Sequence, residues 1–290
     1  GHLNPAVVEE VKASLDTGML FVTPSPISTD AAERICRRFG IDQVRFTNSG
    51  TESTMYAVRV ARSATGKRDI VKVEGGYHGS YDPFVVSSKP KLDAAGDADF
   101  PTAVVDENLV AGNVHVVPYN NPESLEQIFA KHASTIACFI VEPVLENIGI
   151  VLPDAGYLER VRELCDQYGI VLIFDEVKTG LTAGHQGAAQ RLGVKPDLIT
   201  LAKSIGGGIT LAAFGGKQKY MDFVVNGKMA HFGTFNGNPL AMAGIRAVDK
   251  ICTAETLAAA EALNQQALER ISEIIEEYQL PAHTVGFGVK

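Results

Sequence analysis

Apolar and polar positions along the chain form two kinds of segment that alternate. Short unbroken apolar runs, such as residues 136–141 and 170–174, are typical of strands that are buried on both faces. Segments with helical periodicity separate them, and one of these, residues 157–168, ends at a glycine, a common helix terminator. Strands of this type alternating with helices predict an α/β fold, a mainly parallel sheet covered by helices on both sides.

The same pattern places the individual elements. The expected strands cover residues 44–46, 70–73, 114–118, 136–141, 170–174, 197–201 and 211–214. The expected helices cover residues 1–16, 29–39, 51–63, 123–131, 157–168 and 239–277. The first of these has Asn4 as its expected cap and Pro5 as its first helical residue, and the last has an expected break near Cys252. Residues 87–112 show little pattern and are expected to form a long loop.

Composition and charge exclude several classes of partner. The 290 residues are 46% hydrophobic and carry a net charge of -8, which argues against a nucleic-acid surface and against an anionic membrane. No stretch approaches the roughly 18 apolar residues of a membrane span. The four cysteines are far apart and form no CxxC, so we expect free, buried thiols in a reducing cytoplasm. Because the sequence starts at Gly1 rather than Met, we expect the natural protein to be longer.

One apolar run leads directly into two carboxylates. Residues 170–174 are followed by Asp175 and Glu176, and a buried carboxylate needs a cation or strong hydrogen-bond donors. Three interpretations compete: a helix cap or structural ion pair, the Walker B strand of a P-loop NTPase, and an aspartate facing the pyridinium nitrogen of pyridoxal 5′-phosphate (PLP). The second requires GxxxxGK[ST], and none of the Gly-Lys pairs in the sequence fits that motif.

A lysine follows another expected strand. Lys203 comes just after residues 197–201 and just before a triple glycine, residues 206–208. A lone lysine is usually a solvated surface charge. A lysine at the carboxyl end of a strand, beside glycines that permit close approach of a ligand, is a better candidate for a Schiff-base nucleophile. The spacing from Asp175 fits one strand, one helix and one strand, which would bring both side chains to one crevice.

Two further segments come directly after expected strands. Residues 47–52, Thr-Asn-Ser-Gly-Thr-Glu, lead into a helix whose N-terminus is suited to bind a phosphate. The same residues also fit an ordinary Ser/Thr cap with Glu52 in the first turn. Residues 75–79, Gly-Gly-Tyr-His-Gly, offer an aromatic face beside flexible backbone, which suits stacking on a planar ring.

Together these segments resemble the class III aminotransferases of PLP fold type I, and most closely the glutamate-1-semialdehyde aminomutase branch. The resemblance spans nearly the whole chain, with its motifs in the family's order. The segments that carry it are residues 48–52, 76–79, 142–144, 174–177, 201–203, 206–208, 233–234 and 237–239.

The resemblance implies catalytic roles for two residues. Lys203 would carry the cofactor, pyridoxal 5′-phosphate, as a Schiff base and would later shuttle the proton. Asp175 would pair with the pyridinium nitrogen and keep it protonated, so that the ring acts as an electron sink. Around the ring, Tyr77 would stack on one face with His78 beside it, Val177 would pack on the other face, and Asn147 would contact the 3-hydroxyl.

The phosphate contacts implied by the resemblance come from two segments. Ser49, Gly50 and Thr51 would bind the phosphate at the helix N-terminus. Thr234 would reach the phosphate of the neighbouring subunit, which implies a homodimer with shared active sites. A purely local alternative is that Thr234 caps the following helix.

The family pattern also implies a division of the chain. Residues 1–40 would be an N-terminal helical segment, residues 41–250 the large PLP-binding domain, and residues 251–290 a linking helix with the start of a truncated C-terminal small domain. The sequence departs from the pattern at Lys178, where relatives usually carry an uncharged residue, at Thr182, which replaces a common arginine, and at Glu146 beside the proposed cofactor contact. No arginine is assigned to a substrate carboxylate.

The expected function is amino-group transfer from an amine or amino acid to a keto acid by a ping-pong mechanism. One alternative is an aminomutase, in which amine and carbonyl belong to one molecule. An alternative of another class is a non-catalytic PLP-fold binding module, against which the presence of both Lys203 and Asp175 argues. The remaining histidines show no metal-ligand spacing, so no metal is expected.

Overall fold

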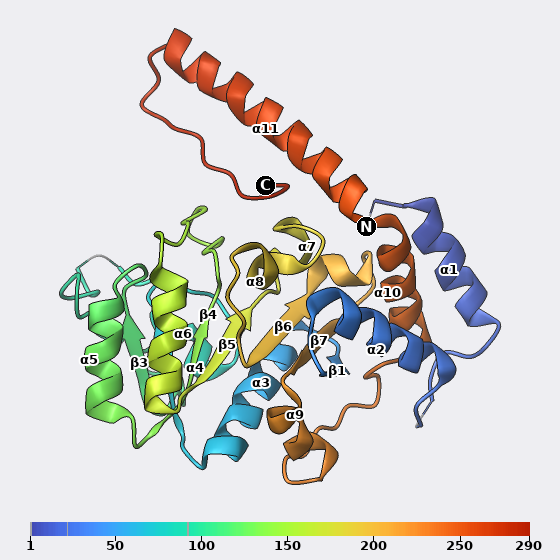
Figure 1. Ribbon diagram of the computed structural model, residues 1–290, viewed down its shortest axis with the longest axis horizontal. Coiled ribbons are helices and arrows are strands. Elements are labelled where there is room, and N and C mark those ends of the chain that lie inside the picture. The colour runs from blue at the N-terminus through green and yellow to red at the C-terminus, as the bar shows by residue number, and fades with distance from the viewer. Residues whose placement is uncertain (1, 22, 92) are drawn as a thin grey trace.

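The chain forms one seven-stranded sheet with helices on both faces (Figure 1). The computed structural model describes residues 2–21, 23–91 and 93–290; residues 1, 22 and 92 lie outside the described part. The strands are β1 (Gln43–Thr47), β2 (Asp69–Val73), β3 (Val114–Val117), β4 (Ile136–Val141), β5 (Val171–Asp175), β6 (Leu198–Ala202) and β7 (Ala212–Gly216). Their order in the sheet is β1-β7-β6-β5-β4-β2-β3.

The sheet is mainly parallel, as expected. Strands β3, β2, β4, β5 and β6 pair in parallel, whereas β7 runs antiparallel to both β6 and β1. The carboxyl ends of β5 and β6 therefore lie side by side, with Asp175 paired to Thr200 in the register of the two strands. This edge is where a parallel sheet presents its ligand site.

The helices confirm most of the expected elements and add short ones. They are α1 (Pro5–Leu15), α2 (Pro26–Phe39), α3 (Gly50–Thr65), α4 (Asp82–Val85), α5 (Pro122–His132), α6 (Tyr157–Tyr168), α7 (Thr179–Thr182), α8 (Gly187–Arg191), α9 (Gln218–Val225), α10 (Pro239–Ile251) and α11 (Ala254–Glu277). The short helices α4, α7, α8 and α9 were not expected. Asp175 and Lys203 are consequently joined through two short helices rather than one, because residues 179–191 are too broken by turns for a single helix.

One helix begins earlier than the pattern suggested. The expected helix started at residue 29, whereas α2 starts at Pro26, with Ser25 as its cap. The Ser25 hydroxyl accepts from the Ser28 amide at 3.4 Å, and the Ser28 hydroxyl accepts from the Ser25 amide at 2.9 Å. This reciprocal capping box with a proline at the first position fixes the start of the helix. Asn4 caps α1 as expected, accepting from the Ala6 amide at 3.0 Å.

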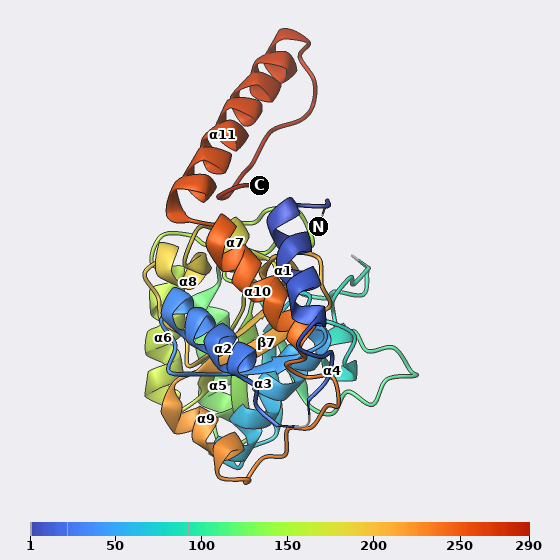
Figure 2. The ribbon, with the colours of Figure 1, turned by 90° about the vertical axis from the view of Figure 1, so that its right-hand side faces the viewer.

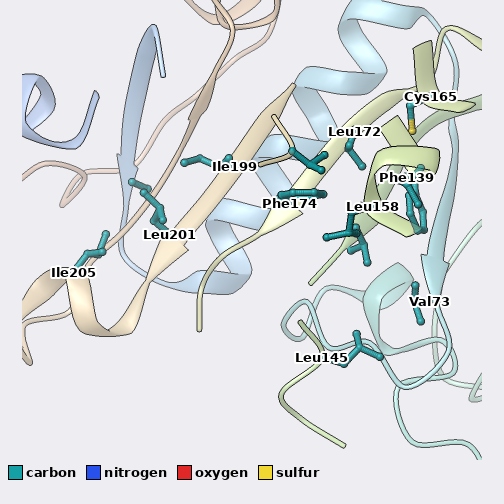
Figure 3. Packing of buried hydrophobic residues seen from close by; sticks show 14 of the residues in the cluster. Val73, Phe139, Leu145, Leu158, Cys165, Leu172, Phe174, Ile199, Leu201 and Ile205 are labelled. Atoms are coloured by element: carbon teal, nitrogen blue, oxygen red, sulfur yellow. The ribbon is translucent and has the colours of Figure 1, made fainter. Parts of the chain in front are cut away.

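Both faces of the sheet are buried in separate apolar layers. On one face Phe139, Leu172 and Phe174 pack with Leu158 and Cys165 of α6 (Figure 3). Residues of α5 and α2 belong to the same cluster. On the other face Ile140 and Ile173 pack against α3 and α9. Successive residues of a strand point to opposite faces, so a strand between two layers is apolar at most of its positions. This explains the unbroken apolar runs in the sequence.

The C-terminal helix α11 stands away from this body (Figures 1 and 2). It follows α10 after a break at Cys252, as expected, and none of its 24 residues is buried. All four cysteines are free, but only Cys138 and Cys165 are buried. The expectation of buried thiols is therefore wrong for Cys36, within α2, and for Cys252, at the end of α10, which are both half-buried. Across the described residues, no helix has both the length and the apolar character needed to cross a bilayer.

Candidate active site

A cavity of about 320 Å³ opens at the carboxyl ends of β5 and β6. Its size is within the usual range for a small-molecule site. It collects residues from distant parts of the sequence, because the loops after β1, β2, β4, β5 and β6 all reach this edge. Nine of the ten predicted cofactor contacts line it, namely Ser49, Gly50, Thr51, Tyr77, His78, Asn147, Asp175, Val177 and Lys203.

Asp175 is held in a fixed orientation at the bottom of this cavity. Its carboxylate is 3% exposed, and the ring of His78 donates from Nδ1 to Oδ2 at 2.8 Å. The other oxygen, Oδ1, accepts from the Val177 amide at 3.0 Å and from the Thr200 hydroxyl at 3.1 Å. These three donors satisfy the hydrogen-bonding needs of the buried carboxylate, and no described Lys or Arg forms an ion pair with it. The simple interpretation of Asp175 as a helix cap is wrong, since its side chain caps neither α7 nor α8.

Lys203 follows the neighbouring strand in an unusual backbone conformation. Its φ is 52°, in the left-handed region, and it opens a 3₁₀ turn over Lys203–Gly206. A residue with a side chain adopts this conformation at a cost of about 1–3 kcal/mol, and such residues concentrate at functional sites. The pKa of the Lys203 ammonium is lowered, mainly by burial and also by the charge of Lys178, while Asp175 opposes the shift.

The N-terminus of α3 forms the wall that faces these two residues. Ser49 caps the helix, and its hydroxyl accepts from the Glu52 amide at 3.2 Å. The amides of Gly50 and Thr51 belong to the first turn, which has no intrahelical acceptors, so they remain available to an anion in the cavity. The Ser cap that the sequence offered as one alternative is confirmed, and the segment also lines the cavity, so its phosphate-binding role stays a prediction.

Glycines permit the close approach of segments around this wall. A Cβ on Gly79, whose φ is +99°, would lie 2.4 Å from the Thr51 hydroxyl oxygen. A Cβ on Gly50 would lie 3.2 Å from a methyl group of Val177. A side chain at Gly79 is therefore excluded, and one at Gly50 would press against Val177.

Tyr77 and Asn147 form the outer wall, and Glu142 connects them. The Tyr77 side chain is 42% exposed, and its amide donates to Glu142 Oε1 at 3.0 Å. The Asn147 side-chain amide donates to Glu142 Oε2 at 3.3 Å. Burial raises the pKa of the Glu142 carboxyl. Glu142 thus positions both walls, although the sequence marked it only as part of a motif.

Three lining or supporting residues were not assigned a role from the sequence. They are Glu142, Thr200 and Lys178. Thr200 is fully buried within a strand of apolar residues. A polar residue in this apolar run was the one feature of the sequence that could have indicated its contact with Asp175. Lys178 was noticed as a departure from the family pattern without a function.

Thr234 is the predicted contact that does not join the cavity. It is exposed and lies in a separate surface hollow that also includes Phe21, Arg45 and Phe232. Asn238, not Thr234, caps α10, accepting from the Ala241 amide at 3.0 Å. The local alternative for Thr234, a cap of the next helix, is therefore wrong.

The residues of the cavity fit PLP by their chemistry. The planar ring of PLP could stack between the aromatic side chain of Tyr77 and the aliphatic side chain of Val177. The ring nitrogen could bind to the carboxylate of Asp175. The phosphate could bind to the amides and hydroxyl groups of the first turn of α3. The aldehyde could react with the amine of Lys203, whose lowered pKa favours the nucleophilic neutral form.

Comparison with known proteins agrees with this fit. The sequence profile of the family "Aminotransferase class-III" matches residues 1–289. The glutamate-1-semialdehyde 2,1-aminomutase of Methanocorpusculum labreanum is 41% identical over 292 residues, which cover 100% of this chain and 68% of the relative.

Solved structures give the same result. An omega-transaminase from Sphaerobacter thermophilus superposes with a TM-score of 0.95 at 35% identity, covering 99% of this chain and 67% of its own. A transaminase with PLP bound superposes with a TM-score of 0.90 at 33% identity, covering 99% of this chain and 68% of its own. The chain thus spans about two thirds of the length of the relatives it matches.

Proposed function

This chain belongs to the class III aminotransferase family, whose cofactor is PLP, and we propose that it moves an amino group from an amine or amino acid to a keto acid in a ping-pong sequence. The observation that carries this proposal is the placement of Lys203 and Asp175 in one cavity, at the ends of the adjacent strands β6 and β5. The packing of the sheet alone requires neither two charged residues at these strand ends nor the left-handed backbone of Lys203.

PLP, when bound, supplies an aldehyde that captures the amine and a ring that accepts the electrons released at the substrate carbon. In our proposal Lys203 attaches the cofactor through its Nζ, is displaced by the substrate amine, and then moves the proton at the substrate carbon as a general base. Its lowered pKa increases the fraction of neutral amine at neutral pH, which both roles require.

Asp175 would hold a proton on the ring nitrogen of the cofactor. His78, Thr200 and the Val177 amide fix its carboxylate, so no reorientation is needed when the ring binds. Ser49, Gly50 and Thr51 would bind the phosphate at the start of α3. Tyr77 and Val177 would enclose the ring, His78 would act through Asp175, and Asn147 would contact the 3-hydroxyl.

Borohydride reduction followed by peptide mapping tests the proposal. We expect the reduced protein to carry the pyridoxyl group on Lys203 and, before reduction, to absorb in the visible region. A pyridoxyl group on another lysine, such as the buried Lys72, would overturn the assignment. A panel of amine donors with pyruvate and 2-oxoglutarate would then define the substrates.

An intramolecular aminomutase is the second candidate, favoured by the name of the Methanocorpusculum labreanum relative. Steady turnover of a single substrate without added keto acid, free of a lag, would support the aminomutase. A requirement for a separate keto acid would support the aminotransferase. A non-catalytic binding module would bind PLP and would show no turnover, either of a single substrate or of an amine with a keto acid.

We also propose a homodimer in which Thr234 completes the phosphate site of the partner. Its exposure, and its separation from the cavity of its own subunit, support this arrangement. In mixed dimers of Lys203→Ala and Thr234→Trp subunits, both lesions would fall on one site and leave the other intact. Partial recovery of activity is expected, and no recovery in mixed dimers that demonstrably form would contradict a shared site.

The remaining proposals concern organisation and location. We propose residues 1–40 as an N-terminal helical segment, residues 41–250 as the PLP-binding domain and residues 251–290 as a linking segment. The absence of buried residues in α11, described over its whole length, supports the last boundary. The free thiols support a reducing compartment, the cytoplasm.

A further inference from the structure

A second lysine lines the same cavity as Lys203. Lys178 follows Val177 at the start of α7 and is half-buried. Its ammonium donates to the backbone oxygen of Glu146 at 2.9 Å. An ammonium has three donors, so this single bond to a neutral oxygen leaves both its charge and two of its protons for another partner.

The carboxylates around Lys178 are bound to other groups. Glu146 forms an ion pair with Lys290 at 2.6 Å, and Asp175 is bonded to His78 at 2.8 Å. Glu142 accepts from the Tyr77 amide at 3.0 Å. Within the described residues, no carboxylate forms an ion pair with Lys178. The cavity therefore contains a positive charge that no acidic side chain neutralises.

We propose that Lys178 is a specificity-determining residue that binds the carboxylate of the substrate, so that the enzyme prefers amino and keto acids over simple amines. The inference rests on the proposed function, because it places the reacting amine at Lys203 in the same cavity. Once Lys203 is engaged by the cofactor, Lys178 is the lysine left on the cavity wall among the residues that the structure describes. A half-buried ammonium binds a carboxylate by charge-assisted hydrogen bonds, which are stronger than bonds between neutral groups.

The electrostatics of the cavity agree with this placement. Lys178 and Lys203 line one cavity, and the charge of Lys178 contributes to the lowered pKa of Lys203, after burial and against the opposing charge of Asp175. A carboxylate bound at Lys178 would offset that repulsion. Substrate binding would then be coupled to the state of the lysine that performs the proton transfer.

The competing role for Lys178 is purely structural, since its bond to Glu146 fixes the loop after β4 across the cavity. The two roles predict different responses to the charge of a ligand. A lost loop contact would weaken charged and neutral ligands alike. A lost anion site would weaken only the charged one.

The experiment compares butyrate with its neutral isostere butyramide. Both dissociation constants are measured by saturation-transfer NMR titration of the full chain with PLP bound, so the readout does not depend on turnover. The variants are Lys178→Gln, which keeps a neutral donor for Glu146, and Lys178→Arg, which keeps the charge. Lys195→Gln is the matched control, because it removes the same charge from an exposed position outside the cavity.

We expect wild type to prefer butyrate over butyramide by about tenfold, the size of one charge-assisted hydrogen bond. Lys178→Gln should abolish most of this preference, whereas Lys178→Arg and Lys195→Gln should keep it. An unchanged preference in Lys178→Gln, or equal loss of affinity for both ligands, would overturn the inference. A pyridoxyl label away from Lys203 would contradict the proposed function instead, and the preference is measurable on the protein in either case.

Discussion

Two carboxylates that are neighbours in the sequence, Asp175 and Glu176, occupy opposite sides of the end of β5. Asp175 faces the cavity and receives bonds from side chains that come from β6 and from the loop after β2. Glu176 points away from the cavity toward α8. There its oxygens accept from the amides of Ala188, at 2.6 Å, and Ala189, at 3.0 Å.

The two surroundings have different consequences. Backbone amides of one short helix surround Glu176, and a Cβ on Gly187 would come within 2.5 Å of its Oε2. That side of the strand is closed, and its carboxylate organises α7 and α8. The side that holds Asp175 opens into a cavity, so its carboxylate can meet a ligand. Equal burial of two carboxylates therefore does not indicate equal function. The hydrogen-bond donors around each carboxylate, and the open space beside Asp175, distinguish Asp175 from Glu176.

The largest effect is expected for Lys203→Ala on the cavity side. The change removes the proposed nucleophile and general base, and a general base alone contributes about 10²–10⁴-fold. Turnover should fall by at least about 10³-fold, and borohydride should no longer fix the cofactor at position 203. Thermal unfolding should change little, because alanine keeps the Cβ and therefore the same left-handed backbone, and the atoms that are removed line an open cavity. A variant with wild-type turnover would refute the role of Lys203.

Asp175→Asn should have the next largest effect. The amide cannot hold the ring proton, and each unit of pKa lost from the ring nitrogen corresponds to about 1.4 kcal/mol. Turnover should therefore fall by orders of magnitude while cofactor content, measured by absorbance after denaturation, falls far less. Kinetics like those of wild type would contradict the assignment of Asp175.

Glu176→Gln should give the opposite result, with stability affected and turnover preserved. In the variant the glutamine nitrogen would face a backbone amide that in wild type donates to the Glu176 carboxylate. The lost hydrogen bond should lower the free energy of unfolding by about 1–3 kcal/mol. Urea unfolding should report this loss. A large loss of turnover in a stably folded variant would show that the two sides of β5 are not separate.

The pH dependence of stability sharpens the same test. Burial raises the pKa of Glu176 from its ordinary 4.5 to about 7. Between these values the folded state binds more protons than the unfolded state, so the free energy of unfolding falls as the pH rises through this window. Glutamine does not titrate. The stability difference between wild type and Glu176→Gln should therefore narrow from pH 5 to pH 8.

The smallest effects are expected for a pair of threonines. Thr200 donates to Asp175 at 3.1 Å, and Thr179 donates to Glu176 at 3.3 Å. Thr200→Val should lower turnover several-fold, whereas Thr179→Val should lower only stability, by about 1 kcal/mol. Steady-state kinetics and urea unfolding of both variants would distinguish these outcomes, and equal effects of the two on turnover would contradict the separation.

Local patterns made most of the fold predictable. The apolar runs located every strand to within about two residues, because a strand between two helical layers must be apolar on both faces. Caps such as Asn4 worked for the same reason, since a cap bonds within its own helix turn. The boundary of α2 was missed although the capping residues Ser25 and Ser28 were in the sequence. Short helices without periodicity, such as α8, leave no such signal.

The sequence by itself determined the type of sheet, the ends of the strands and thereby the residues that meet at one edge, including Asp175 and Lys203. Only the tertiary structure decided the partners across that edge. His78 reaches Asp175 from a loop 97 residues away in the chain, and β7 enters antiparallel between β6 and β1. The left-handed turn at Lys203 and the unpaired charge of Lys178 also appeared only there. The physical reason is range: periodicity and caps act within a few residues, whereas partners, strain and uncompensated charge depend on which distant segments pack together.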